Sequence, residues 1–355
     1  MEFIMAMGSA GIAYGVARSL VPLLITIAHR FNILDCPDSG LKRHKQPTAY
    51  LGGVAVYAAI LVSSIGLLSL DARAFFLIAG VTLLLFLGLI DDLQPQTPLF
   101  KFAGQAIAAL CFLRGGLDLK HEFLENASLF PEIGALGWSL VSALWIALVT
   151  NGFNLIDVMD GYAAVNGIGA ALLFALAAFF SGSSDVIILM MALCGGLYGF
   201  FKYNKPPAQI YLGDAGSLSV GGLLAATPFM ITWGAKGALG ICLPVIILAI
   251  PLSEVMMLII IRTMLGIPFY RGSRHHAIHF LRDRGWSVEQ ILIAVGCYYS
   301  AAAIVAILFF SGSIGQNKAL CAGAAIFLFW LLLVYGPKSA NVAFSLFLRK
   351  EQQTF

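Results

Sequence analysis

The sequence is poor in charged residues. Asp, Glu, Lys and Arg make up 11% of its 355 residues, whereas a soluble globular protein carries about 25%. Its six cysteines form no CxxC pair and five of them lie inside apolar runs, so neither a disulfide framework nor a zinc site is indicated. The N-terminus lacks the basic segment of a cleavable signal peptide, and we expect its apolar run to remain as a membrane span.

Long apolar runs take the place of charge. Hydrophobic residues make up 60% of the chain, and the mean hydropathy is +0.90. A helix needs about 20 apolar residues to cross a hydrocarbon core about 30 Å thick, so the sequence predicts an all-α, polytopic membrane bundle of about 10–11 helices. A membrane β-barrel would instead show alternating strands of about ten residues. The eleven candidate spans are 4–27, 50–70, 74–92, 99–116, 138–156, 162–181, 185–202, 208–232, 238–262, 288–311 and 318–337.

The basic residues are distributed unevenly between the two ends of this bundle. If the spans alternate in direction, fifteen Lys and Arg residues lie on the side of the C-terminal tail and five lie on the other side. Cytoplasmic loops are enriched in Lys and Arg. We therefore expect the N-terminus to lie outside and the C-terminus to lie in the cytoplasm.

Polar residues at membrane depth gather on the predicted cytoplasmic side. Asp91 and Asp92 end the third span, Asp214 lies near the start of the eighth, and Glu254 lies late in the ninth. A transporter would be expected to place such groups near the midplane, between internal repeats, and the sequence has no convincing repeat. The pattern indicates a one-sided site at the cytoplasmic interface.

The paired carboxylates Asp91 and Asp92 indicate a divalent cation. They stand where an apolar helix stops before Pro95, and the C-terminal end of a helix disfavours negative charge. A cation would reverse this problem, and oxygen ligands favour Mg²⁺, or alternatively Mn²⁺, over zinc. An ordinary acidic start to a loop is the competing interpretation.

The segment "NGFNLIDVMDGYAA" at 151–164 carries two amides and two carboxylates spaced by three, namely Asn151, Asn154, Asp157 and Asp160. Four such positions fan over about 180° of a helix, so a single straight helix cannot aim all of them at one ligand. We therefore expect the helix to end or change direction around Gly152 or Gly161. Helix capping is the competing interpretation, although a cap needs only one such residue.

The segment "NKPPAQIYLGDAGSLSVGG" at 204–222 carries an aspartate inside an apolar span. Two prolines open the segment, and Asp214 lies among glycines that allow the backbone to approach a ligand closely. A charged group at this depth is costly and suggests a functional site. A packing kink with a capping aspartate is the competing interpretation.

Two basic segments complete the pattern. Lys42, Arg43, His44 and Lys45 form a cationic patch in the first cytoplasmic loop, although topogenic charge or attraction to anionic lipids would also explain it. The segment "RGSRHHAIHFLRDRG" at 271–285 suits an anion such as a diphosphate better than zinc, because its arginines would repel a cation. A solvated basic loop is the alternative. The histidines are His275, His276 and His279, and the nearby arginines are Arg262, Arg271, Arg274, Arg282 and Arg284.

Taken in order, five motifs resemble those of the polyprenyl-phosphate N-acetylhexosamine-1-phosphate transferases: "KRHKQPTAYLGG", "LIDDL", "NGFNLIDVMDGYAA", "NKPPAQIYLGDAGSL" and "RHHAIHFLRDRG". The resemblance implies transfer of a sugar-1-phosphate from a UDP-sugar to undecaprenyl phosphate, with release of UMP, at the cytoplasmic face of the bacterial plasma membrane. It implies a requirement for Mg²⁺. We expect a single transmembrane transferase domain over 1–355, with its active site in the loops near 28–50, 92–98, 151–161, 202–209 and 263–287.

The resemblance also implies roles for individual residues. Asp91 and Asp92 correspond to the paired catalytic carboxylates, with Asp214 and Asp92 as metal ligands, and His276 and His279 to catalytic histidines. The sequence leaves open whether Asp91 or Asp92 acts as base, nucleophile or ligand. We expect the substrates to be bound by Lys42, His44, Asn151, Asn154, Asp157, Asp160, Asn204, Arg271, Arg274 and His275.

Two bacterial branches of these enzymes use different donors. One uses UDP-GlcNAc or a relative and starts O-antigen, common-antigen or teichoic-acid chains; the other uses UDP-MurNAc-pentapeptide and starts peptidoglycan. This chain lacks the three consecutive histidines of the second branch, and the spacing from His279 to Gly285 is that of the first. Ile278 replaces a usual histidine, and Glu254 replaces a usual aspartate. We also expect Ile278 and Phe280 to form a compact, partly apolar wall for the donor.

Other functions stay open as alternatives. The first is the phospho-N-acetylmuramoyl-pentapeptide transferase of peptidoglycan synthesis. The second, from another class, is a transporter or lipid flippase with a one-sided anion site, which would move its substrate without releasing UMP. The expected partners are a UDP-N-acetylhexosamine, undecaprenyl phosphate, the lipid bilayer and a second copy in a homodimer, and no nucleic acid.

The charge asymmetry predicts the accessibility of two loops. A single cysteine introduced at Ser183 should react with a membrane-impermeant thiol reagent added to intact cells, whereas one at Gln209 should react only after permeabilisation. The wild-type protein, labelled in parallel, reports the reactivity of the native cysteines. The reverse pattern would contradict the predicted orientation.

Overall fold

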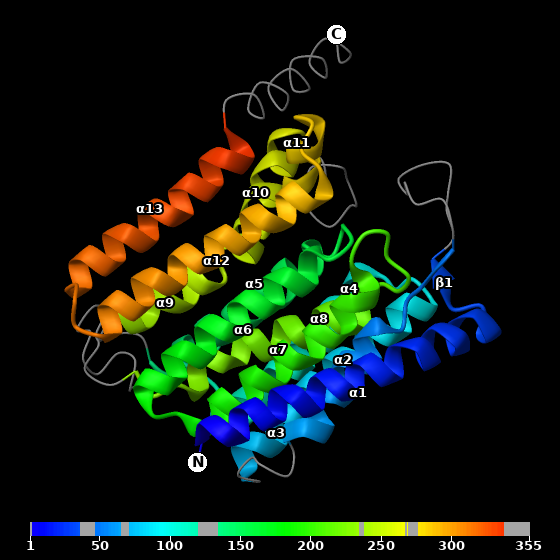
Figure 1. The fold of residues 1–355 in the computed structure, drawn as a ribbon, viewed down its shortest axis with the longest axis horizontal. Helices are drawn as coiled ribbons and strands as arrows, with labels where there is room; N and C mark the ends of the chain where they lie inside the picture. The colour runs from blue at the N-terminus through cyan, green and yellow to red at the C-terminus, as the bar shows by residue number, and fades with distance from the viewer. Residues whose placement is uncertain are drawn as a thin grey trace.

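The computed structural model describes residues 2–35, 47–64, 71–119, 134–233, 238–266, 268 and 276–336. Apart from two short strands, the elements of this part of the chain are helices, most of which lie alongside one another (Figure 1). Seven described helices are long and apolar enough to cross a membrane. This confirms the predicted all-α, polytopic membrane bundle. The seven lie in α1 (Glu2–Phe31), α3 (Ala72–Leu93), α5 (Ala135–Leu155), α6 (Tyr162–Ser181), α7 (Ser184–Asn204), α12 (Val288–Phe310) and α13 (Gln316–Tyr335).

The remaining helices are shorter. Four of them correspond to predicted spans or parts of spans: α2 (Gly52–Ser64), α4 (Pro98–Arg114), α8 (Gly213–Ala226) and α10 (Ala249–Met264). The single span predicted at 238–262 is instead two helices, α9 (Ala238–Ile247) and α10, which meet at Leu248. The break has a simple cause, because Pro251 has no N–H to donate to the carbonyl four residues earlier. The span predicted at 208–232 begins as a helix only at Gly213 and ends in a 3₁₀ turn, η2 (Thr227–Met230).

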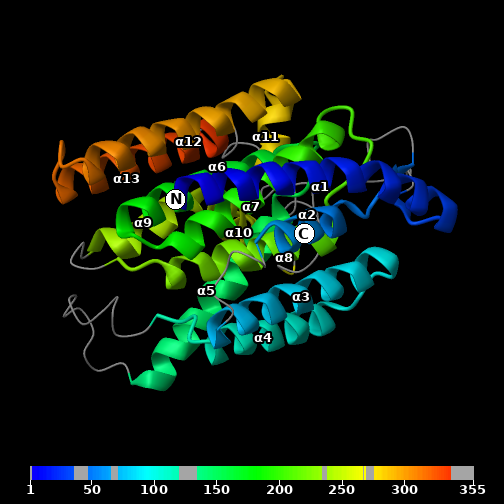
Figure 2. The same ribbon diagram turned by 60° about the horizontal axis from the view of Figure 1, so that its bottom comes forward.

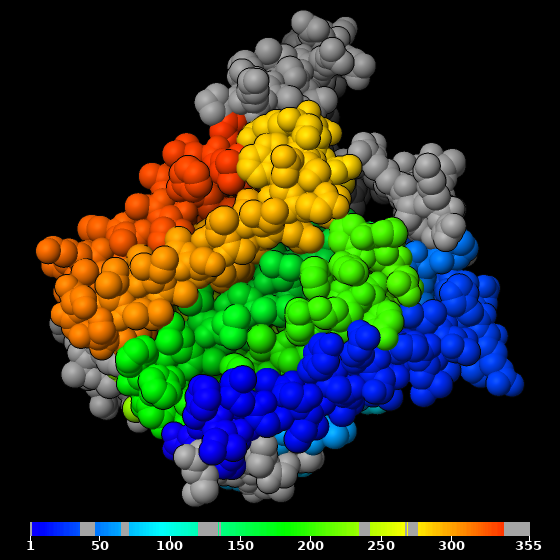
Figure 3. Space-filling view, viewed as in Figure 1, coloured from blue at the N-terminus to red at the C-terminus, as the bar shows by residue number. Residues whose placement is uncertain are grey.

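The bundle has a centre and two flanking pairs. Figure 2 shows α3 and α4 along one side and α12 and α13 along the opposite side, with α5 to α8 between them. Helix α1 packs along α7, and α1 and α12 both lie on the face seen in Figure 3. Large apolar side chains of these two helices are exposed, among them Ile12, Leu23, Ile304 and Ile307. Such a surface fits contact with lipid tails rather than water.

Glycines bring α2 and α3 onto the start of α8. A Cβ built on Gly88 of α3 would lie 2.2 Å from the backbone of Asp214, and one built on Gly53 of α2 would lie 2.1 Å from the nitrogen of Gly216. Small residues allow membrane helices to approach this closely. These contacts set the position of the α8 N-terminus.

A small sheet joins the first loop to the segment before α8. Strand β1 (Leu34–Asp35) pairs antiparallel with β2 (Thr48–Ala49), and Ala49 forms a parallel bridge with Ile210. Tyr211 donates its N–H to the carbonyl of Ala49 at 2.8 Å. The apolar runs of the sequence do not indicate these strands, because two-residue strands carry no periodicity.

The contact between α3 and α8 predicts an asymmetric response to two similar substitutions. Gly88→Ala forces a methyl group into the backbone of Asp214 and should cost about 1–3 kcal/mol of folding free energy, seen as a lower Tm in detergent. Gly11→Ala is the matched control, because Gly11 is exposed on α1 with nothing within 4 Å of an added Cβ. An equal Tm for the two variants would mean that the α3 and α8 backbones can separate at little cost.

Candidate functional site

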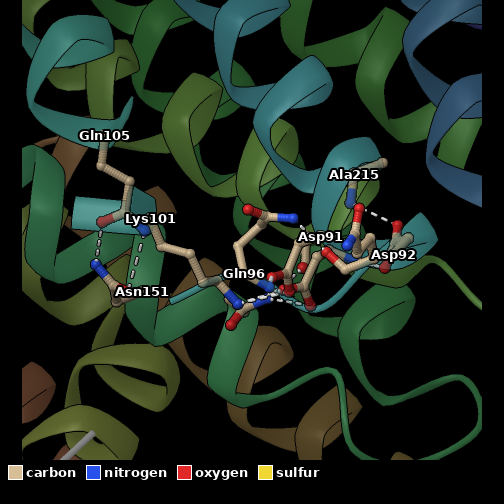
Figure 4. A network of polar contacts seen from close by, with 11 residues as sticks. Asp91, Asp92, Gln96, Lys101, Gln105, Asn151 and Ala215 are labelled. Atoms are coloured by element: carbon tan, nitrogen blue, oxygen red, sulfur yellow. Dashed lines mark hydrogen bonds and ion pairs between the residues drawn. The ribbon is translucent and has the colours of Figure 1, made fainter. Parts of the chain in front are cut away.

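Four segments distant in the sequence meet at one end of the bundle. They are the C-terminal end of α3, the first turns of α4, the link from α5 to α6, and the N-terminus of α8. Figure 4 shows part of this network, with Asp91 beside the end of the Lys101 side chain, Asp92 beside Ala215, and Gln105 beside Asn151. Most of the carboxylates singled out in the sequence lie here, so the acidic motifs form a single cluster.

Lys101 of α4 holds two of these carboxylates together. Its Nζ lies 2.7 Å from Oδ2 of Asp91 and 2.7 Å from Oδ2 of Asp214. The second oxygen of Asp91 accepts the N–H of Gln96 at 2.8 Å. Both ion pairs are partly buried, so they are screened less than surface pairs. In the sequence, Lys101 is only one of the fifteen basic residues on the predicted cytoplasmic side, since nothing in a linear pattern shows that residues 91 and 214 share one lysine.

Asp92 caps the N-terminus of α8. Its Oδ1 accepts the N–H of Asp214 at 2.8 Å, and its Oδ2 accepts the N–H of Ala215 at 3.0 Å. Gly213 has a φ of +73°, and a Cβ there would lie 2.7 Å from Asp92 Oδ2. A carboxylate at a helix N-terminus is electrostatically favourable. This position explains how an acidic residue is tolerated at the end of α3.

The two amides of the 151–160 segment have different hydrogen-bond partners. Asn154 donates to Asp214 Oδ1 and to Ser217 Oγ, both at 2.8 Å, and so belongs to the cluster. Asn151 instead donates to Gln105 Oε1 at 2.6 Å and to the carbonyl of Ala147 at 2.8 Å. The structure thus gives Asn151 a helix-packing partner in α4 rather than a carboxylate.

The helix break lies at one of the two predicted glycines. Helix α5 ends at Leu155, and α6 begins after Gly161, whose φ is +75°. Gly152 is not the break, because it lies inside α5, where a Cβ would meet the carbonyl oxygen of Pro251 at 2.6 Å. Its role is close packing of α5 against α10.

The link from α5 to α6 is braced by neighbouring loops. Asp160 Oδ2 accepts the N–H of Ala208 at 2.9 Å. Asn204 accepts the N–H of Gly161 at 2.9 Å and donates to the carbonyl of Ile210 at 2.9 Å. The Asn204 amide therefore ties the two loops together.

Asp157 lies in this link, beside the cluster. Its burial, followed by the negative charges of Asp214 and Asp92, raises the pKa of its carboxyl to about 8. A hydrogen bond from the backbone of Gly213 acts in the opposite direction but is outweighed. The site therefore crowds more negative charge than its surroundings neutralise.

A second group of residues surrounds the short helix α11 (Ala277–Asp283). His276 precedes α11, and its Nδ1 lies 3.0 Å from Oε1 of the buried Glu254. The ring of His279 stands 5.9 Å from that of His276, edge to face. The predicted apolar wall is wrong, since Ile278 and Phe280 are 3% and 8% exposed and pack into the core. The predicted residues Lys42, His44, Arg271, Arg274 and His275 lie outside the described residues.

The cluster has the chemistry of a site for a hard cation. Within the described residues, no group of three or more His, Cys, Asp or Glu side chains has the spacing of a ready metal site. Carboxylate oxygens of Asp91, Asp92 and Asp214 meet here, and Mg²⁺ prefers oxygen ligands. Part of the raised pKa of Asp157, after the larger effect of burial, comes from the charges of Asp214 and Asp92, and a bound cation would reduce that repulsion.

The comparisons with known proteins decide the family. Residues 74–232, which hold the whole acidic cluster, match the model described as glycosyl transferase family 4. A Streptomyces coelicolor protein provisionally named as a glycosyltransferase is 30% identical over 332 residues, covering 90% of this chain and 74% of the relative. The chain belongs to glycosyl transferase family 4. This confirms the resemblance seen in the motifs.

Two further relatives within the family carry more specific names. A Bacillus subtilis protein, provisionally named an undecaprenyl-phosphate N-acetylglucosaminyl 1-phosphate transferase, is 28% identical over 295 residues, covering 81% of this chain and 80% of the relative. A phospho-N-acetylmuramoyl-pentapeptide-transferase of Listeria innocua is 31% identical over 249 residues, covering 65% and 76%. Similar identity to both means that overall similarity does not separate the two donor branches.

The raised pKa of Asp157 predicts a pH-dependent effect of its removal. The pKa of this carboxyl is about 8 in the folded protein and 3.8 ordinarily, so the folded state loses stability as the pH rises from about 4 to about 8. In a chelating buffer, Asp157→Asn should therefore raise the Tm relative to the wild-type protein at about pH 8, and the gain should shrink at about pH 5. Thermal unfolding in detergent measures the Tm of both proteins at each pH. An increase in Tm of the same size at both pH values would contradict the charge crowding.

Proposed function

We propose that this protein transfers an N-acetylhexosamine-1-phosphate, most simply GlcNAc-1-phosphate, from its UDP-sugar to undecaprenyl phosphate, with release of UMP. The reaction would take place at the cytoplasmic face of a bacterial plasma membrane and start a cell-envelope glycan. The observation that carries the proposal is the acidic cluster with Lys101 at one end of a membrane bundle. The names of the relatives in Bacillus and Listeria support the same reaction class.

The position of the cluster suits one water-soluble and one lipid substrate. It is built where α3 ends and where α6 and α8 begin, so a UDP-sugar could approach from the aqueous side. The outer surfaces of the bundle are apolar, so a polyprenyl chain could remain among lipid tails while its phosphate reaches the helix ends. An enzyme joining these two substrates needs both surfaces within reach of one site.

The reaction is a phosphoryl transfer. An oxygen of the acceptor phosphate forms a bond to the β-phosphorus of the UDP-sugar, and the bond from that phosphorus to the oxygen shared with the α-phosphate breaks. The electron pair leaves with UMP, and the product is the sugar diphosphate lipid. A phosphate monoester is already largely dianionic near pH 7, because its second pKa is about 6, so the acceptor needs no strong base. Such catalysis depends mainly on positioning and neutralisation of charge.

The chain's own groups supply much of that positioning. Lys101 provides a positive charge between Asp91 and Asp214 and would attract a phosphate oxygen. Asp92 fixes the first turn of α8, and Asn154 fixes the side chain of Asp214. His276 and His279 would add donors for the diphosphate, with Lys42, His44, Arg271, Arg274 and His275 as further candidates from the basic loops.

Mg²⁺ is the cation that the donor set suits best, with Mn²⁺ as the alternative. Asp214 and Asp92 would hold it, with Asp91 beside them. When bound, it would neutralise the diphosphate and stabilise the leaving UMP.

The alternative donor is UDP-MurNAc-pentapeptide, which the similarity to the Listeria relative favours. Two features of the histidine segment favour the smaller donor. The segment lacks three consecutive histidines, and the spacing from His279 to Gly285 is that of the GlcNAc branch. The deciding experiment is UMP release by the purified protein supplied with undecaprenyl phosphate, Mg²⁺ and both donors in competition. A higher kcat/KM for the pentapeptide donor would reverse the branch, and lipid movement without UMP would favour a flippase.

Asp214→Asn should abolish most turnover while the fold survives. A neutral amide can still accept from Asn154 but cannot neutralise a cation or pair with Lys101 comparably. Loss of about 3 kcal/mol of transition-state stabilisation corresponds to a rate drop of more than about a hundredfold.

The matched control is Asp185→Asn, which lies in the first turn of α7 at the other end of the bundle. Its turnover and Tm should stay close to those of the wild-type protein. Near-normal turnover of Asp214→Asn at saturating Mg²⁺ would exclude Asp214 as an essential ligand.

A further inference from the structure

The carboxylate of Glu254 is buried near the middle of α10 and has no part in the acidic cluster. Its side chain is 2% exposed. It meets donors from two other elements: Nδ1 of His276 at 3.0 Å, the N–H of Ala277 at 3.2 Å from both carboxylate oxygens, and the hydroxyl of Tyr335 at 3.4 Å. A carboxylate at this depth is costly unless it is fully used, and these contacts indicate what it is used for.

Glu254 supplies the cap that α11 does not have. His276 is the residue before the helix, and its side chain makes no capping hydrogen bond. The first N–H of α11 goes instead to Glu254, across 23 residues of chain. An orphan N–H at a helix start needs such a partner when it is buried. The start of α11 is therefore fixed by α10.

Helix α13 holds the other side of α11. The guanidinium of Arg284, just after α11, donates to the carbonyls of Leu333 and Val334. The ring of Phe280 packs against Tyr335 with centroids 5.9 Å apart. Since Tyr335 also reaches Glu254, the histidine-bearing helix is clamped between α10 and α13.

The pairing with Glu254 also selects the tautomer of the His276 ring. A carboxylate only accepts hydrogen bonds, so Nδ1 of His276 carries the hydrogen and Nε2 is left for another partner. Figure 1 places α11 at the end of the bundle to which α10 runs. The N-terminal part of α12, which follows α11, packs near Gly161, because Leu292 lies 3.3 Å from a Cβ built there. Thus α11 is joined through α12 to the loop that carries Asp157 and Asp160.

We propose that Glu254 is a positioning residue for the transfer reaction: through Nδ1 of His276 and the first N–H of α11, it presents Nε2 of His276 to the anionic substrate. The inference rests on the proposed function. Glu254 acts through His276 and does not itself touch the substrate. Its partner on the far side is Tyr335, in the last described helix, so residues well beyond the five motifs support the site.

Glu254→Gln tests this role with little change of shape. The side-chain oxygen of the glutamine can still accept the N–H of Ala277. The NH₂ group of the glutamine, however, can donate to Nδ1 of His276 and so favours the tautomer with hydrogen on Nε2. We expect kcat for UMP release to fall at least about tenfold, with the KM for the UDP-sugar changed less than about threefold, because a misdirected catalytic group acts mainly on the transition state. Glu254→Asp keeps the charge and should recover part of kcat.

The matched control is Ser253→Ala. Ser253 is the neighbouring buried residue of α10, and among the described residues its hydroxyl donates only to the carbonyl of Ile250, three positions earlier. This variant should keep the wild-type kcat. Its Tm, and those of the two Glu254 variants, show whether each protein is folded.

A spectroscopic measurement separates positioning from general loosening. In protein labelled with ¹⁵N-histidine, with the His276 signal assigned from a His276→Gln sample, the ring nitrogens of neutral His276 should show hydrogen on Nδ1. In Glu254→Gln that hydrogen should move to Nε2. An unchanged ring form, or a wild-type kcat in Glu254→Gln, would overturn the positioning role, whereas absence of UMP release by the wild-type protein would instead overturn the proposed function.

Discussion

The candidate site depends on one helix end capping another. At the C-terminus of α3, the carboxylate of Asp92 accepts the first free N–H groups of α8. The negative end of one helix would repel this carboxylate, and the positive end of the other attracts it. The contact needs two backbones at a distance that only Gly88 permits. Once the ends are joined, Asp91 and Asp214 stand on either side of the junction, within reach of one lysine.

The junction explains why several neighbouring polar residues serve structure before chemistry. Asn204 and Asp160 form hydrogen bonds with the backbones of the two adjoining loops. Asn154 orients Asp214, and Asn151 binds Gln105 on α4. A motif rich in Asn and Asp therefore supplies residues of the acidic cluster and also residues that hold the cluster and its loops in position.

The sequence predicted the positions of the helices better than the breaks and connections between them. Apolar runs marked the seven long helices to within a few residues, because the thickness of the bilayer sets the length that a spanning helix needs. The break at Gly161 followed from the angular spacing of Asn151 to Asp160. The break at Leu248, the late start of α8 and the paired strands did not follow, since each depends on a local proline or on a partner far along the chain.

The acidic half of the site was predicted more completely than its partners. Asp91, Asp92 and Asp214 stand out because charge is rare in apolar spans. Lys101 and Glu254 were visible as charges, but their roles come from contacts with residues 113 and 22 positions away. The burial of Ile278 could not be read from a short basic loop, because it depends on how α11 packs against the rest of the bundle.

The cap on α8 has a consequence for the biogenesis of the protein. Asp92 and the amide it binds are separated by 122 residues, and chains are made from the N-terminus. While α3 to α7 are entering the membrane, Asp92 at the end of α3 lacks its structural partners, because the N–H groups of Asp214 and Ala215 have not yet been synthesised. The acidic cluster can assemble only when the eighth helix arrives, so shorter nascent chains cannot contain it.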